Sequence, residues 1–183
     1  MEKKKYLPAA LILYLNYFIH GVGCSILGQS VIKEALAASW GVEAMSITAI
    51  SAALGLGRLV ALPFAGPLSD KLGRRISVVI GGASYAIYLI GLALAFNAGT
   101  HGGYQIAYIC AIIGGIANSF LDTCVSPTCM EIYVNNPSVA NLFTKFSMCI
   151  SQFLLPFLIG FVSAANMSYR TIFIVAGAAI FID

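Results

Sequence analysis

Four ionisable side chains lie inside long apolar stretches of the sequence, namely His20, Arg58, Asp122 and Lys145. A charge at the centre of a lipid bilayer costs at least ~2.5 kcal/mol, so each charged group there needs a partner or a wet cavity. Asp122 is the candidate for proton exchange. Burial raises the pKa of a carboxylate in a cavity and a nearby cation lowers it, so the two effects together can bring the pKa near neutral pH. The alternative is a permanent ion pair with Arg58 or Lys145 that only holds helices together. Lys145 could also snorkel to the membrane surface.

Polar side chains four residues apart mark two further candidate surfaces. Asn16 and His20 share one helical face, because residues four apart lie one above the other on a helix. Asn118 and Asp122 share another face by the same spacing. A hydrogen bond between helices is the simpler explanation for His20, and proton transfer is the alternative. A cation such as Arg58 suits a ligand that carries a carboxylate.

The composition excludes an ordinary water-soluble domain. Of the 183 residues, 60% are hydrophobic and only 9% are charged, against roughly a quarter charged in a soluble domain. The net charge of +3 is too small for nucleic-acid binding, which needs clustered Lys and Arg. Five cysteines without a C-x-x-C pair argue against a disulfide framework or a metal site. No Walker or G-x-G-x-x-G pattern indicates a nucleotide cofactor.

Apolar stretches long enough to cross a bilayer recur along the chain. A span needs about 20 mostly apolar residues at 1.5 Å per residue. The last apolar stretch offers about 13 residues, roughly 20 Å, which is too short to span. We therefore predict an all-α membrane protein of six transmembrane helices, with the sixth truncated at Asp183 or continued in a longer protein. The predicted spans are residues 6–27, 42–65, 76–96, 104–132, 142–163 and 171–183.

Lysine and arginine are distributed unequally between the two ends of these spans. Six of them, in the segments 3–5 and 71–75, fall on one side, whereas Lys33 and Arg170 fall on the other. Cytoplasmic loops carry the excess of Lys and Arg, so the N-terminus is predicted to be cytoplasmic. The loop 133–140 then also lies in the cytoplasm, and the expected location is the cell membrane.

The segment between the second and third predicted spans carries the most specific pattern. Residues 66–75 read GPLSDKLGRR and match G-x-x-x-D-(R/K)-x-G-(R/K)-(R/K), so the chain resembles the major facilitator superfamily in its loop between spans two and three. Physically, Gly66 permits close helix approach and Gly73 a tight turn. Asp70 can cap the next helix or pair with Arg74. The resemblance implies a conformational latch that holds the outward-open state, made of Gly66, Asp70, Lys71, Gly73, Arg74 and Arg75.

A second resemblance concerns the end of the fourth predicted span. Glu131 lies where the superfamily often has an acid that pairs with the basic end of the loop pattern, so Arg74 or Arg75 is its expected partner. An ordinary carboxylate at the membrane interface is the alternative. Asn141 stands where many relatives have arginine.

A third resemblance points to a cargo. Residues 121–127 read LDTCVSP and are similar to the L-(E/D)-T-x-x-N-P segment of the fucose permease branch of sugar:proton symporters. There the acid takes up and releases the proton, which implies that role for Asp122. Ser126 replaces the asparagine of that branch, and the first span has no acid where the branch has a second one.

The resemblance as a whole implies the N-terminal half, residues 1–183, of a secondary transporter that carries a small polar solute by alternating access. Sugar:proton symport is the first expectation, and an organic-anion or drug transporter of the same superfamily is the alternative. The expected partners are the lipid bilayer, the solute, protons and a C-terminal six-span half. In this superfamily spans one and four line the pathway, so Asn16, His20 and Asn118 are expected to bind the substrate. Arg58 in the second span is the fourth expected substrate-binding residue, because a cation at that depth suits a carboxylate.

Two other classes fit the sequence less well. Leu155 stands where drug:proton antiporters have a glycine before Pro156, which argues against efflux by that group. An enzyme is not expected, because His20 and His101 are far apart in sequence and no nucleophile with a base or HExxH pattern is present.

Overall fold

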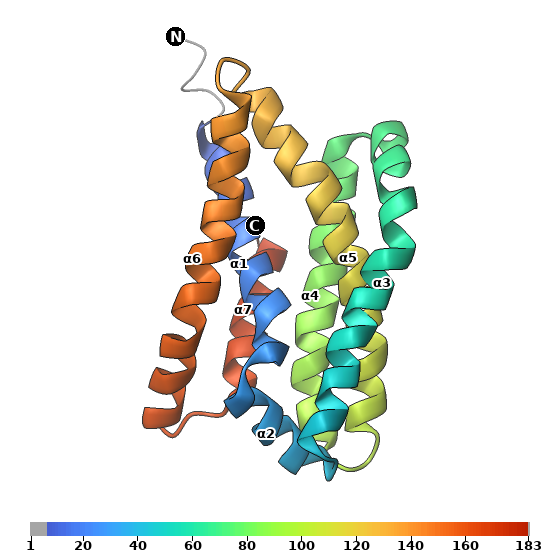
Figure 1. Cartoon of the computed structure of the whole chain (residues 1–183), viewed down its shortest axis with the longest axis vertical. Helices are drawn as coiled ribbons and strands as arrows, with labels where there is room; N and C mark the ends of the chain where they lie inside the picture. The colour runs from blue at the N-terminus through green and yellow to red at the C-terminus, as the bar shows by residue number, and fades with distance from the viewer. Residues whose placement is uncertain (1–6, 183) are drawn as a thin grey trace.

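Helices make up all the regular structure in the part of the chain that the computed structural model describes, residues 7–182 (Figure 1). The N-terminal lysines used to predict orientation lie outside these residues. The elements are α1 (Leu7–Ser25), the short 3-10 helix η2 (Ile26–Gly28), α2 (Ser30–Trp40), α3 (Ala44–Leu72), α4 (Arg74–Ala98), α5 (Gly103–Ile132), α6 (Pro137–Ala164) and α7 (Arg170–Ile182).

Five of the helical segments are long and apolar enough to cross a membrane: Leu7–Gly28, α3, α4, α5 and α6. Each overlaps one of the first five predicted spans, although α3 extends to Leu72, beyond the predicted end at residue 65, and α6 begins at Pro137, before the predicted start at residue 142. The apolar helix α7 has 13 residues, fewer than the ~20 that a span needs. The prediction of an all-α membrane protein is therefore confirmed, whereas the sixth span remains a prediction.

The segment 66–75 is not the loop that the sequence suggested. Helix α3 continues to Leu72, with Pro63 and Pro67 inside it, and α4 starts at Arg74. Only Gly73 separates the two helices, and its φ of +88° is one that glycine adopts without strain. The close approach expected at Gly66 is wrong, because a Cβ at that position would meet no atom within 4 Å.

Helix α2 is an element that the sequence analysis missed. It is too short to span a membrane, and it crosses the end of the bundle opposite the N-terminus (Figure 1). Its buried Ile32, Leu36 and Trp40 recur every four residues, which is the period that could have revealed it. The Trp40 Nε1 donates to the Ala95 carbonyl oxygen at 2.8 Å and so ties α2 to the end of α4.

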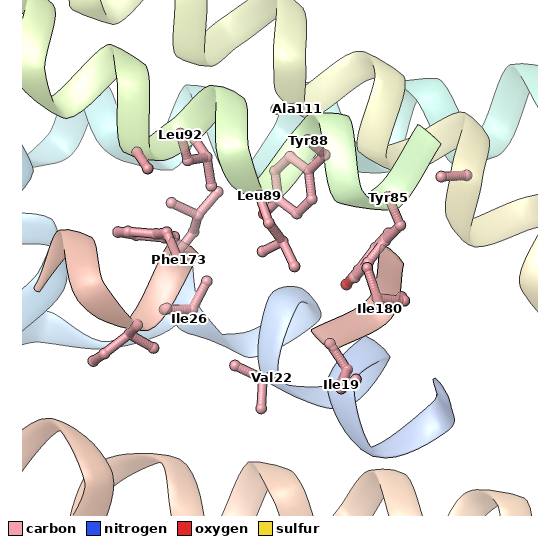
Figure 2. Packing of buried hydrophobic residues seen from close by; sticks show 14 of the residues in the cluster. Ile19, Val22, Ile26, Tyr85, Tyr88, Leu89, Leu92, Ala111, Phe173 and Ile180 are labelled. Carbon is pink, nitrogen blue, oxygen red and sulfur yellow. The ribbon is translucent and has the colours of Figure 1, made fainter. Parts of the chain in front are cut away.

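The helices pack as two groups that meet along α4. Helices α3, α4 and α5 lie together, while α6 lies beside α1 and α7 lies behind α1 (Figure 1). One face of α4 packs on α7 and α1: Tyr85 and Leu89 approach Ile180 and Ile19 (Figure 2). This apolar core fixes the distance between the two groups of helices.

Helices α3 and α5 approach each other unusually closely. A Cβ at Gly115 would collide with the Leu54 carbonyl oxygen, and one at Gly57 would collide with the Ile112 carbonyl oxygen. Small residues allow such backbone contact between membrane helices. Because Arg58 follows Gly57 directly, this contact holds the Arg58 backbone against α5.

Candidate functional site

A charged cluster lies between four helices inside the bundle. The Asp122 carboxylate on α5 lies 2.7 Å from Arg58 Nη2 on α3, through its Oδ2. Its Oδ1 lies 3.5 Å from Lys145 Nζ on α6 and accepts a hydrogen bond of 2.8 Å from the Tyr17 hydroxyl on α1. One carboxylate therefore joins two cations and a phenol that are far apart in sequence.

Two members of the cluster lie near the middle of spanning helices, whereas Lys145 lies in the first third of α6. Arg58 occupies the midpoint of α3, and Tyr17 lies near the midpoint of α1. The side chains of Arg58 and Lys145 are 49% and 50% exposed, whereas Asp122 is only 15% exposed. Because lipid solvates charge poorly, the open sides of both cations require a polar cavity or an anion.

Tyr17 is a contact residue that the sequence analysis missed. Its hydroxyl lies 3.1 Å from Ser126 Oγ as well as bonding Asp122, and Lys145 Nζ lies 4.9 Å from its ring centroid. A cation over an aromatic face is attracted by the ring quadrupole. The position of Tyr17 next to Asn16 in the sequence is the signal that could have identified it. Ser126, which replaces the asparagine of the fucose permease branch, thus also contributes a hydroxyl to the charged cluster.

A second, uncharged cluster lies beside the first. Asn16 and His20 on α1 and Asn118 on α5 are all buried. The Cys24 thiol donates to Asn118 Oδ1 at 3.7 Å, while Tyr17 and Tyr85 each meet the His20 ring edge-on, with centroids 5.3 Å apart. Asn118 and Asp122 thus share one face of α5, as their spacing predicted, and the structure places that face against Cys24 and Tyr17 of α1.

Four polar atoms of this second cluster have no hydrogen-bond partner among the described residues. They are Asn16 Oδ1, both ring nitrogens of His20, and Asn118 Nδ2. Neither ring nitrogen of His20 makes a hydrogen bond of good geometry, although the side chains of Cys24 and Asn118 lie beside the ring. The His20 backbone oxygen accepts a hydrogen bond from the Tyr85 hydroxyl. A buried polar atom without a partner costs about 1–3 kcal/mol, so the cluster is suited to a polar ligand.

The residues expected to form a latch gather at the end of the bundle that carries the N-terminus. Arg74 Nη2 lies 2.8 Å from Glu131 Oε1, which brings the start of α4 to the end of α5 as predicted. The pair of Asp70 with Arg74 is not formed, because Arg74 turns to Glu131, and Asp70 makes no cap on α4. Asp70, Lys71 and Arg75 are exposed and make no ion pair within residues 7–182.

The described residues contain no group of three or more His, Cys, Asp or Glu that could hold a metal ion. The five cysteines are free. Within this part of the chain, the two polar clusters and the Arg74–Glu131 pair are therefore the arrangements that call for a functional explanation.

The chain belongs to the Major Facilitator Superfamily, whose family profile matches residues 13–182. It is 35% identical over 181 residues to the inner membrane transport protein YdiM of Escherichia coli, which covers 99% of this chain and 43% of that protein. It is 31% identical over 166 residues to the uncharacterized MFS-type transporter YfkL of Bacillus subtilis, covering 91% of this chain and 40% of that protein.

A more distant relative is the quinolone resistance protein NorA of Staphylococcus aureus, 26% identical over 170 residues, or 91% of this chain and 41% of that protein. The chain thus spans about two-fifths of the length of the curated relatives it matches. YdiM and YfkL are named as transport proteins, and the family together with the five spanning helices indicates a multi-pass membrane protein.

Proposed function

We propose that this chain forms the N-terminal six-span half of a proton-coupled secondary transporter that carries a small polar solute by alternating access. The observation that carries the proposal is the ion pair of Asp122 with Arg58 and Lys145 at membrane depth. A buried ionisable residue of a membrane helix is a functional candidate by default, and here its partners come from other helices. In such transporters the site lies at the midplane between two repeats.

Proton binding can be coupled to a conformational change because Arg58 and Lys145 share the Asp122 carboxylate. When Asp122 is ionised it holds α5 to α3 and α6 through its two cations. A proton on Asp122 removes its charge and weakens both contacts, so the proton binds with different affinity to conformations that keep or break them. A ligand shifts a conformational equilibrium only through such a difference in affinity.

Sugar:proton symport is the first candidate. The support is the resemblance of residues 121–127 to the fucose permease branch, together with the unpartnered amide and imidazole groups of Asn16, His20 and Asn118, which suit hydroxyl ligands. In this proposal Asp122 carries the proton. Asn16, His20, Asn118 and Arg58 contact the solute.

The test is solute uptake by the complete gene product reconstituted in liposomes, with and without an imposed pH gradient. We expect proton-driven uptake that Asp122→Asn abolishes, while exchange of labelled for unlabelled solute continues, because exchange needs no net proton movement. Lys33→Gln on α2 is the control for removal of a charge elsewhere. Unchanged proton-driven uptake in Asp122→Asn would refute the coupling role.

An organic-anion or drug transporter is the second candidate. It is favoured by the two cations on one carboxylate, and the quinolone resistance protein NorA is a relative. Activity that requires Arg58 but tolerates loss of Asp122 would support this candidate over sugar:proton symport.

The proposed location is the cell membrane with a cytoplasmic N-terminus. The junction between α3 and α4 and the loop between α5 and α6 lie at the same end of the bundle as the start of α1 (Figure 1). All three are therefore proposed to face the cytoplasm. Proteolysis of an N-terminal epitope in spheroplasts and in inverted vesicles tests this orientation. Cleavage in spheroplasts would reverse the orientation.

A further inference from the structure

The charges within the spans do not balance. Among the described residues, the charged groups away from the helix ends are Arg58, Lys145 and Asp122. Two cations share one carboxylate, which leaves an excess of one positive charge at membrane depth. A charge there is costly unless it is paired or wet.

The unused donors of the cations point to the missing partner. Arg58 uses one nitrogen on Asp122 and its side chain is 49% exposed, and Lys145 contacts the carboxylate at a longer 3.5 Å. A guanidinium has five N–H donors arranged to bind a carboxylate in a bidentate manner. The two cations can therefore bind a ligand carboxylate, which takes the place of the Asp122 charge when Asp122 is protonated.

The neighbouring cluster of Asn16, His20 and Asn118 is suited to a different kind of ligand group. Asn118 precedes Asp122 by one helical turn, and His20 meets the ring of Tyr17, which bonds Asp122. The unpartnered atoms of Asn16, His20 and Asn118 offer both donors and acceptors but no charge. Hydroxyl groups satisfy such a mixed set, and a site built for hydroxyls strongly rejects a ligand that lacks them.

We propose that the transported solute is a small hydroxylated carboxylate, with its carboxylate on Arg58 and Lys145 and its hydroxyls on the cluster of Asn16, His20 and Asn118. This inference rests on the proposed transport function and deepens it. The uncharged cluster is buried in this conformation, so the proposal requires a local separation of α1 from α5 when the solute binds, in addition to the movement of one half against the other.

The same arrangement explains why a proton would accompany the solute. Asp122 and the solute carboxylate compete for the same two cations. A proton transferred from water to an Asp122 oxygen frees both cations, and the solute anion then takes the place of the Asp122 charge. The net charge of the site stays the same with or without cargo, so no additional charge is left in the membrane.

Matched solutes test the inference. D-glucuronate keeps the ring of D-glucose and has a carboxylate in place of the C6 hydroxymethyl group, so this pair isolates the carboxylate. D-gluconate is an open-chain acid with the same configuration at C2 to C5. The complete gene product is reconstituted in liposomes that contain a pH indicator, and its thermal stabilisation by each solute is measured in detergent. We expect at least one of the two acids to stabilise the protein and to acidify the liposome interior, and D-glucose to do neither.

Variants separate the two halves of the site. Arg58→Gln is expected to weaken binding of the acid at least about tenfold, with Arg58→Lys retaining part of it. His20→Phe and Asn118→Leu are expected to weaken it about tenfold through the hydroxyls, a loss of about 1.4 kcal/mol each. Asp122→Asn should still be stabilised by the acid but should no longer couple its entry to proton influx. Lys33→Gln on α2 should behave as the unmodified protein.

The outcomes distinguish this inference from the proposed function. Proton influx with D-glucose but with neither acid would overturn the inference and leave proton-coupled transport standing. Stabilisation by an acid without proton influx would keep the inference and refute proton coupling. Absence of stabilisation by both acids would overturn the inference.

Discussion

Arg58 Nη2 and Asp122 Oδ2 lie 2.7 Å apart although the two residues are 64 positions apart in the chain. The contact depends on backbone packing, because Gly57 and Gly115 bring α3 against α5. Ser119 Oγ also donates to the Arg58 carbonyl oxygen at 2.9 Å, which fixes the α3 backbone at this level. The charged cluster is thus a product of close helix packing.

Removing one charge of this pair should destabilise the protein more than removing both. Asp122→Asn leaves two cations without a carboxylate and should cost about 1–3 kcal/mol, because an unpaired charge at membrane depth is poorly solvated. The double variant Arg58→Gln with Asp122→Asn should recover part of this loss. Thermal unfolding of the complete gene product in detergent measures both. A double variant less stable than either single variant would show that the pair is not coupled.

The close packing of α3 on α5 predicts different results for the same substitution at two glycines. Gly115→Ala should destabilise the protein by about 1–3 kcal/mol, because the added Cβ collides with backbone that cannot move aside without displacing α3. It should also separate Arg58 from Asp122. Gly55→Ala is the matched control, since a Cβ there meets nothing within 4 Å. Equal melting temperatures for the two variants would contradict this packing.

The Arg74–Glu131 pair should bias the conformational equilibrium of the transporter. Both side chains are partly exposed, so the pair is worth roughly 0.2–1 kcal/mol. Glu131→Gln should therefore shift the balance between inward-open and outward-open forms by up to about fivefold. Labelling of a cysteine placed in the cytoplasmic cavity would measure the shift.

The charge-swapped variant Arg74→Glu with Glu131→Arg is the control for this latch, because it restores the attraction. Arg75→Gln should change labelling less than Arg74→Gln, since Arg75 makes no ion pair within the described residues. Identical labelling in Glu131→Gln and the unmodified protein would remove the latch role of the pair.

Trp40 should anchor α2 through both its ring and its N–H. Trp40→Phe removes the hydrogen bond to the Ala95 carbonyl oxygen and should cost about 1 kcal/mol. Trp40→Ala also removes the buried ring and should cost about 3–5 kcal/mol. Ser39→Ala removes the neighbouring hydrogen bond from Ser39 Oγ to the Phe96 carbonyl oxygen. Its melting temperature shows how much that bond stabilises the protein compared with the Trp40 bond. The readout is the melting temperature in detergent.

The spans are determined by local sequence. Each of the five long helices could be read from a run of apolar residues, because the bilayer sets a minimum length that hydropathy reveals without knowledge of neighbours. Gly73 could also be read, since a tight turn between two helices requires a residue that adopts positive φ. The family could be recognised from residues 66–75, because that pattern is also local and can be read without knowledge of the tertiary structure.

Tertiary structure decided which polar groups meet. The sequence left open whether Asp122 pairs with Arg58 or with Lys145, and the bundle joins it to both. It suggested Asp70 as a partner of Arg74, but the end of α5 presents Glu131 instead. The hydrogen bond of Tyr17 to Asp122 and the lack of partners for the His20 ring nitrogens depend on packing between helices. Local patterns determine where helices form, whereas the angles and separations between helices depend on contacts across the whole bundle, and those contacts alone bring distant side chains together.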